Sequence, residues 1–173
     1  MPVHEKVIEA RTNLVKEKGV FLTSTKDDVR EIEFFQDKSS PSNLDRTAFY
    51  LYLAGSGSSY LSRLKIQYTA SDWLFVKSYR LNIDGTQYVL TPDGVETDIG
   101  YGGTIYEWSD ELLNDNSYDI IKAIISSKSA VIRFEGQKFY DDHTITQKEK
   151  DALRHVLEYH RAVTGNEKPF FSY

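Results

Sequence analysis

The sequence predicts an α+β domain in which a run of antiparallel strands is closed by a C-terminal helix. Aromatic residues make up 13% of the chain, a content that suits half-buried strand surfaces. Asp84-Gly85 separates two strand-like segments, and Thr146-Gln-Lys-Glu149 is a capping box that begins a helix. We therefore expect an antiparallel β-meander or sandwich-like sheet with an N-terminal helix, one short helix before the last strand, and a C-terminal helix packed on the sheet.

The length and composition are those of one ordinary domain. The chain has 173 residues, of which 40% are hydrophobic and 27% charged, so it can bury a core of its own. We find no internal repeat and no interdomain linker. Residues 1–25 are expected to form the N-terminal helix and its connection, residues 26–165 a single α+β domain, and residues 166–173 a C-terminal tail.

The first third of the chain predicts one helix and two strands. Residues 3–17 have apolar positions at helical spacing and are followed by Gly19, a helix stop. Residues 26–37 place apolar and acidic side chains on opposite sides, which is the alternation of a half-buried strand. Residues 47–53 are aromatic or aliphatic at almost every position, so we expect a central strand that is covered on both faces.

The middle third predicts further antiparallel strands. Apolar and polar side chains alternate over residues 63–68, and a longer strand is expected over residues 73–83 because its apolar side chains share one face. These side chains are Trp73, Phe75, Tyr79, Leu81 and Ile83. Asp84-Gly85 supplies the two positive φ angles of a type I′ turn, which predicts a hairpin with residues 87–90. A short strand is expected at residues 104–108.

The last third predicts a helix, a strand and a second helix. Asn116 or Ser117 can cap a helix that ends near residue 127, and residues 130–134 alternate as a strand. The capping box at Thr146 then begins the C-terminal helix, which ends at Gly165. The side chains expected on its sheet-facing side are Leu153, Val156, Leu157 and His160.

Composition excludes several kinds of chemistry. The chain has no Cys, so disulfides, thiolate metal sites and cysteine nucleophiles are excluded. Its net charge of −5 has the wrong sign for binding to phosphate backbones, and we expect no nucleic-acid partner. No apolar run is long enough to span a bilayer, so we expect no direct membrane insertion. The chain as written is expected in the cytoplasm, or outside it if a signal was removed before Met1.

Several short strings in the chain occur together in one known family. They are Asp72-Trp-Leu-Phe75, Asp84-Gly85, Tyr106-Glu-Trp108, Ile132-Arg-Phe134, Tyr140-Asp-Asp142 and Thr144-Ile-Thr146 with Glu149-Lys150. Over about residues 28–164 the chain therefore resembles a family of uncharacterised bacterial α+β domains. The family has no assigned activity. The resemblance implies one domain and a bacterial origin, and it implies no site residue, because turns, aromatic residues and a helix cap carry it.

Asp141, Asp142 and His143 form the cluster that most suggests catalysis. Two carboxylates and an imidazole could hold a divalent metal or share acid–base work. Adjacent residues of a loop point in different directions, however, and acids just before a helix are favoured by its N-terminal dipole. We therefore favour a capping or solvated role for these three residues. We expect no cofactor and no bound metal.

The segment between residues 81 and 121 carries nine acidic residues and no Lys or Arg. It could bind Ca²⁺ or a basic partner through residues such as Asp110 and Asp115, or it could be a solvated rim of the sheet, which we favour. The same segment holds Tyr101, Tyr106 and Trp108, which could form an aromatic platform for a ligand. Strand aromatics are more often part of a core.

No complete catalytic signature occurs in the chain, while the segment that includes residues 101–115 is both acidic and aromatic. We therefore expect a non-catalytic binding or interaction module, with an unknown protein or small ligand as its partner. The alternative is a metal-dependent or acid–base hydrolase centred on Asp141, Asp142 and His143. An enzyme requires these side chains to converge in a pocket, whereas a binding module requires an exposed or grooved patch.

Overall fold

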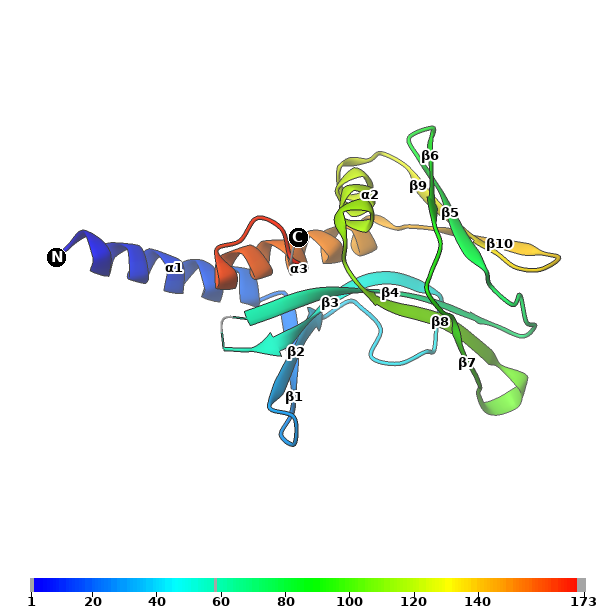
Figure 1. Cartoon of the computed structure of the whole chain (residues 1–173), viewed down its shortest axis with the longest axis horizontal. Coiled ribbons are helices and arrows are strands. Elements are labelled where there is room, and N and C mark those ends of the chain that lie inside the picture. Colours follow the sequence, from blue (N-terminus) through cyan, green and yellow to red (C-terminus); the bar gives the residue numbers. More distant parts are fainter. Residues whose placement is uncertain (1, 58, 171–173) are drawn as a thin grey trace.

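The computed structural model describes residues 2–57 and 59–170. Over these residues the chain forms three α-helices and two antiparallel sheets, as Figure 1 shows. The α+β class predicted from the sequence is confirmed. The helices are α1 (Val3–Gly19), α2 (Asp115–Ser126) and α3 (Gln147–Thr164). The strands are β1 (Leu22–Asp27), β2 (Ile32–Asp37), β3 (Ala48–Ser56), β4 (Ser59–Ala70), β5 (Ser78–Ile83), β6 (Thr86–Leu90), β7 (Glu96–Ile99), β8 (Ile105–Leu112), β9 (Ala130–Glu135) and β10 (Tyr140–Thr144).

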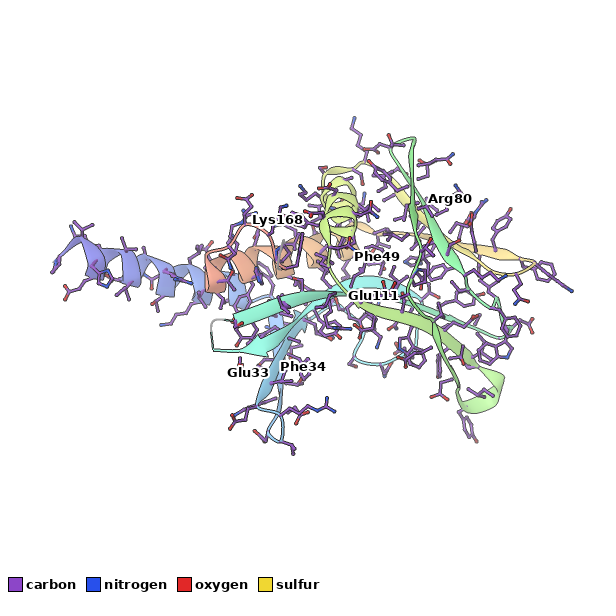
Figure 2. The ribbon with its side chains drawn as sticks, in the orientation of Figure 1. Glu33, Phe34, Phe49, Arg80, Glu111 and Lys168 are labelled. Atoms are coloured by element: carbon purple, nitrogen blue, oxygen red, sulfur yellow. The ribbon has the colours of Figure 1, made fainter. Side chains whose placement is uncertain are left out.

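The larger sheet, called sheet A below, has the strand order β1-β2-β3-β4-β8-β7. Its central strand β3 is the predicted one, and it is buried on both faces over most of its length. One face of sheet A is covered partly by α3, which contacts β2, β3 and β4. Phe49 on β3 is fully buried and lies in the interior in Figure 2. The sequence could predict β3 because a strand that is covered twice is apolar at nearly every position.

The smaller sheet, called sheet B below, has the order β10-β9-β5-β6. After β4 the chain leaves sheet A for sheet B, and it returns at β7, so the strands do not form one continuous meander. Inward side chains of β5 and β9, such as Leu81 and Ile132, are fully buried. Phe134 of sheet B packs on Tyr68 of sheet A with ring centroids 5.3 Å apart. The two sheets, α2 and α3 therefore share one hydrophobic core.

Turn and cap signals in the sequence predict the structure correctly in three places. Asp84 and Gly85 both have positive φ, and the residues that flank them pair across a hairpin between β5 and β6. Thr146 and Glu149 form the predicted capping box of α3, which ends at Gly165 in the left-handed conformation. These signals are reliable because each one acts within a few residues of the chain.

Two predicted strands are wrong in their bounds. Residues 26–37 form a β1–β2 hairpin rather than one strand, because Asp27 accepts hydrogen bonds from the N–H groups of Val29 and Arg30 and turns the chain. β1 already begins at Leu22, inside the segment expected to be a connection. The long strand expected over residues 73–83 begins only at Ser78. Residues 73–77 are irregular, and among them Phe75 has a φ of 56° and an exposed side chain.

Two short strands were not predicted, and a third is longer than expected. β7 is exposed along its whole length and β10 along almost all of it, so neither shows the apolar alternation that identifies a half-buried strand. β8 continues to Leu112, four residues past its predicted end at Trp108. The strand expected as the last one, β9, is therefore followed by β10. This also means that residues 141–143 lie in a strand and not in a loop.

α1 has the predicted position and extends away from the rest of the molecule (Figure 1). It contacts α3, and Arg11 donates hydrogen bonds to the carbonyls of Ala162 and Val163 in the last turn of that helix. No residue of α1 is fully buried, and Val3 and Val7 are largely exposed. The helix is therefore attached along its C-terminal part.

Candidate functional site

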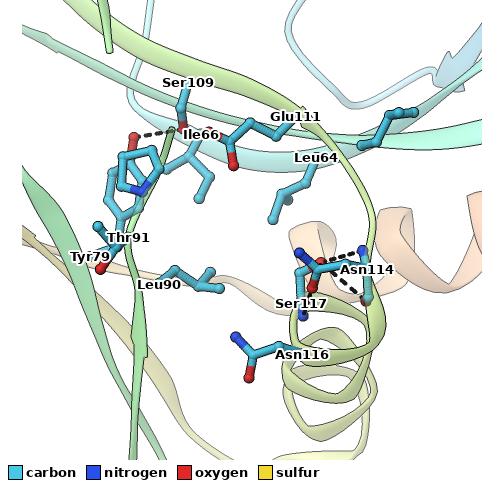
Figure 3. Close-up of a pocket in the computed structure, with 12 residues that line it drawn as sticks. Leu64, Ile66, Tyr79, Leu90, Thr91, Ser109, Glu111, Asn114, Asn116 and Ser117 are labelled. Atoms are coloured by element: carbon cyan, nitrogen blue, oxygen red, sulfur yellow. Dashed lines mark hydrogen bonds between the residues drawn. The ribbon is translucent and has the colours of Figure 1, made fainter. Parts of the chain in front are cut away.

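A cavity of about 90 Å³ lies between sheet A, sheet B and the beginning of α2 (Figure 3). We call it the inner cavity. Leu64 and Ile66 of β4 and Leu90 of β6 supply apolar walls. The residues that line it are Leu64, Ile66, Tyr79, Leu90, Thr91, Pro92, Ser109, Glu111, Leu112, Asn114, Asn116 and Ser117. Half of these residues are polar, so the cavity combines apolar walls with several hydrogen-bonding groups.

Two buried hydroxyl groups meet in the wall of the inner cavity. The Tyr79 Oη and Ser109 Oγ atoms are 2.8 Å apart, and the two residues are only 2% and 4% exposed. Burial raises the pKa of Tyr79 far above 10, and the charges of Glu111 and Glu107 act in the same direction. The Tyr79 hydroxyl therefore stays protonated and remains a hydrogen-bond donor at neutral pH.

Glu111 is the charged residue of the inner cavity. It lies opposite Leu64 on neighbouring strands, so both side chains are on the face of sheet A that points toward sheet B. One oxygen of its carboxylate accepts a hydrogen bond from the N–H of Asp93. Figure 3 shows the carboxylate directed into the cavity, and Figure 2 places it near the centre of the molecule. The Asp93 contact attaches the segment between β6 and β7 to the edge of β8.

The first turn of α2 closes another side of the cavity. Asn114 is the N-cap, its side chain accepting from the N–H of Ser117 while the Ser117 hydroxyl accepts from the N–H of Asn114. The cap expected at Asn116 or Ser117 is therefore wrong, because the cap lies two or three residues earlier, at Asn114. Because Asn114 makes the cap, the side chain of Asn116 is free to face the cavity (Figure 3).

A wider hollow of about 490 Å³, called the outer hollow below, adjoins the inner cavity at the edge of β8. The two share four lining residues, among them Ser109 and Glu111. The complete lining of the outer hollow is Arg63, Asp93, Gly94, Val95, Glu96, Trp108, Ser109, Asp110, Glu111, Leu112 and Asn114. Four of these residues are acidic and one is basic. The exposed hollow and the partly enclosed cavity therefore form one cleft, which we call the β8 cleft.

The sequence candidates of the acidic segment fall into two groups. Trp108 and Asp110 line the outer hollow, and Asp110 accepts hydrogen bonds from the Tyr52 hydroxyl at 2.6 Å and from the Arg63 Nε at 2.8 Å. The three other candidates, Tyr101, Tyr106 and Asp115, line neither hollow.

Each of those three has its own surroundings. Tyr101 is fully exposed, and Tyr106 lies against Gly100, where an added Cβ would be 2.3 Å from its Oη. Asp115 forms an ion pair with Lys168 at 2.6 Å. Tyr106, Trp108 and Asp110 share one face of β8, but the five residues do not line one hollow.

Asp141, Asp142 and His143 lie on β10, and each of them contacts a different partner. Asp141 accepts from the Tyr68 hydroxyl at 3.2 Å, and burial together with this carboxylate raises the pKa of Tyr68 to about 12. Asp142 forms a two-pronged ion pair with Arg133, and hydrogen bonds from this guanidinium lower the pKa of Asp142. The His143 Nε2 atom lies 3.0 Å from Glu149, whose carboxylate also belongs to the cap of α3. The three side chains do not converge on one point.

A second histidine–carboxylate pair connects α3 to β2. The His155 Nδ1 atom lies 2.6 Å from Asp37, and its ring stacks on Phe21 at 4.0 Å. Burial would raise the pKa of Asp37, but hydrogen bonds from Ser39 and His155 outweigh it and lower the pKa. Sequence spacing could not show this pair because its members are 118 residues apart.

Among the described residues, no three His, Asp or Glu side chains are placed to hold a metal ion. No helix in this part of the chain is long and apolar enough to cross a membrane. Comparison with known proteins finds no matching family model, no matching curated protein and no matching solved structure. The resemblance to a bacterial family and the expected compartment therefore stay predictions.

The sequence did not identify Tyr79, Ser109, Glu111 and Asn116 as site residues. The sequence pattern places Tyr79 on one face of a strand, and Glu111 is one acid of the long acidic segment. One signal was present in the β8 segment, since Glu107, Ser109 and Glu111 put polar residues at every second position, on the face that turned out to be buried. Polar residues repeated on an inward face are uncommon without partners or a ligand.

Proposed function

We propose that the chain is a non-catalytic binding module whose ligand occupies the β8 cleft. The observation that carries this proposal is the buried hydroxyl pair of Tyr79 and Ser109 in the wall of a cavity with apolar sides. Two hydroxyl groups carry two hydrogens, and the bond between them uses one. One hydroxyl hydrogen and several lone pairs are therefore left, and the lone pairs can accept hydrogen bonds from a ligand in the cavity.

The polar groups of the cleft are held in place before a ligand arrives. Tyr79 and Ser109 belong to β5 and β8, two strands of different sheets that pack across the common core. Asn116 is in the first turn of a capped helix, and Glu111 is fixed by its bond to the Asp93 backbone. Groups that are fixed in advance lose little entropy on binding, which favours recognition by a preformed site.

The alternative function, a hydrolase centred on Asp141, Asp142 and His143, has less support. Asp142 forms an ion pair with Arg133, and His143 contacts Glu149. The two side chains are therefore engaged with different partners and are not placed to act together on one substrate. The ion pair lowers the pKa of Asp142, which makes it a poor general acid at neutral pH. We therefore keep the binding module as the proposed function.

A fragment screen followed by amide chemical shifts in the ¹⁵N-labelled protein tests this proposal. We expect bound fragments to shift the amides of Leu90, Ser109, Glu111 and Asn116, and to leave the amides of residues 140–144 unchanged. Shifts centred on residues 140–144 would instead favour the hydrolase. A screen in which no fragment shifts the residues of the β8 cleft would contradict the proposal.

A further inference from the structure

The charge of the β8 cleft points to one class of ligand. Glu111 is the only charged residue that lines the inner cavity in the described part of the chain. One of its oxygens is bonded to the Asp93 backbone, and the other has no hydrogen-bond partner among the described residues. A half-buried carboxylate with a free oxygen favours a positively charged donor, because charge-assisted hydrogen bonds are roughly twice as strong as neutral ones.

The outer hollow adds negative charge at the mouth of the cavity. Asp110 is neutralised by Arg63, which it contacts at 2.8 Å. Asp93 and Glu96 are exposed and form no ion pair with any described residue, and Glu111 forms none either. Among the described residues that line it, the cleft thus carries three carboxylates and no cation outside an ion pair, while Lys65 lies beside it, 5.9 Å from the Trp108 ring. Such a surface attracts cations and repels anions.

The positive end of the α2 dipole lies at the same cleft and disfavours a cation. Its effect must therefore be compared with the negative charge of Glu111. A helix N-terminus carries about half a positive charge, and its effect on a nearby exposed ion is about 0.3–1 kcal/mol. Here the Asn114 side chain already accepts a hydrogen bond from the N–H of Ser117, and the acidic residue Asp115 lies in the first turn. The full charge of Glu111 therefore outweighs the helix end, and an anionic ligand is disfavoured.

The shape and the hydrogen-bonding groups of the inner cavity restrict the class of ligand further. The apolar walls formed by Leu64, Ile66 and Leu90 suit an alkyl chain. An ammonium group has three N–H donors, and the cavity offers acceptors in the free oxygen of Glu111, in the Tyr79–Ser109 hydroxyl pair and in the Asn116 amide. The small volume of the cavity fits a single such head group with a short chain.

From these observations we infer that the β8 cleft binds a primary alkylammonium group, carried either by a lysine side chain of a partner or by a free polyamine. This inference rests on the proposed function, because it names the ligand class of the same site. The ammonium group lies between Glu111 and the hydroxyl pair, and its alkyl chain contacts the apolar walls. Asp93 and Glu96 attract the approaching cation.

Titration of the ¹⁵N-labelled protein with three matched small molecules tests the inference at constant ionic strength. Butylammonium carries the charge and three donors, butyltrimethylammonium keeps the charge without donors, and 1-butanol keeps one donor without charge. We expect butylammonium to bind about tenfold more tightly than the other two, with shifts at Ser109, Glu111 and Asn116. Equal affinities of butylammonium and 1-butanol would overturn the inference.

Variants show whether the cavity residues carry the affinity. Glu111→Gln keeps an acceptor for the Asp93 N–H but removes the charge, and we expect it to weaken butylammonium binding by about tenfold or more. Ser109→Ala should weaken it by about fivefold through loss of one hydroxyl. Glu9→Gln on α1 removes the same charge far from the cleft and should leave the affinity unchanged. If Glu9→Gln and Glu111→Gln weaken binding equally, the attraction comes from net charge alone and the inference fails.

Two further ligands distinguish the source of the ammonium group. An acetylated Ala-Lys-Ala amide presents a lysine side chain on a peptide, whereas spermidine is a free polyamine. Either ligand binding more tightly than butylammonium supports the site and identifies the source. If uncharged fragments bind in the β8 cleft but none of the amines does, the ligand class is wrong and the binding module stands. If neither kind of ligand binds there, both proposals fail.

Discussion

The carboxylate of Glu107 is expected to be essential for the stability of the fold. Glu107 is 1% exposed, and its two oxygens accept hydrogen bonds from the N–H groups of Leu74 and Val76, at 2.9 Å each. These two residues flank Phe75, whose φ is positive. Glu107 thus holds the chain where it crosses from sheet A to sheet B. We predict that Glu107→Gln destabilises the protein by about 2 kcal/mol.

That magnitude follows from the geometry of the two hydrogen bonds. The side-chain amide of the Gln variant has one acceptor oxygen. One of the N–H groups of Leu74 and Val76 therefore keeps a weaker, uncharged acceptor, and the other faces the NH₂ group of the amide. These changes cost about 1 and 2 kcal/mol, and removal of a buried charge returns part of the loss. Denaturation in urea measures the change as a shift in midpoint at constant slope. Glu111→Gln is the matched control, because its amide oxygen can still accept the one bond to Asp93. Equal, small shifts in both variants would refute this reasoning.

Three further changes have defined outcomes. In urea denaturation, Phe75→Val should be less stable than Phe75→Asn by about 1 kcal/mol, although Val is more apolar. The reason is that Asn tolerates the left-handed conformation of residue 75. The reverse order of stability would contradict this prediction. Burial lowers the pKa of His160 below 6.5 despite its bond to the Tyr60 carbonyl, so stability should fall as the pH drops below about 6.5, and His160→Gln should flatten that profile. Thr146→Ala should cost about 1 kcal/mol through loss of the α3 cap, and an unchanged melting temperature would exclude that role.

The sequence predicted those parts of the fold that depend on neighbouring residues. The Asp84-Gly85 turn and the capping box of α3 act within four residues, and the apolar run of β3 reports its own burial. The end of the long strand near Trp73 could not be predicted in this way. The chain is irregular there because Glu107, more than 30 residues away, binds two of its N–H groups. Such a contact overrides the local alternation and leaves no local signal.

The candidate site was predicted only in part for a similar reason. Acidity and aromatic content indicated the segment that contributes β8 to the cleft, and Trp108 and Asp110 line the outer hollow. The inner cavity also needs Tyr79 from sheet B and Asn116 from α2, which the sequence alone did not bring together. The alternation of side chains along a strand sorts the residues of β8 into two faces, but it does not show which face packs against the other sheet. That choice depends on the crossing of the chain between the sheets.

Intermolecular nuclear Overhauser effects between butylammonium and the methyl-labelled protein test the central claim most directly, because they locate the ligand as well as detect it. The account predicts contacts from the ligand methylene protons to the methyl groups of Leu64, Ile66 and Leu90, and their loss in Glu111→Gln. Contacts to methyl groups outside the β8 cleft, such as that of Ile99 on β7, with none to these three residues, would contradict it.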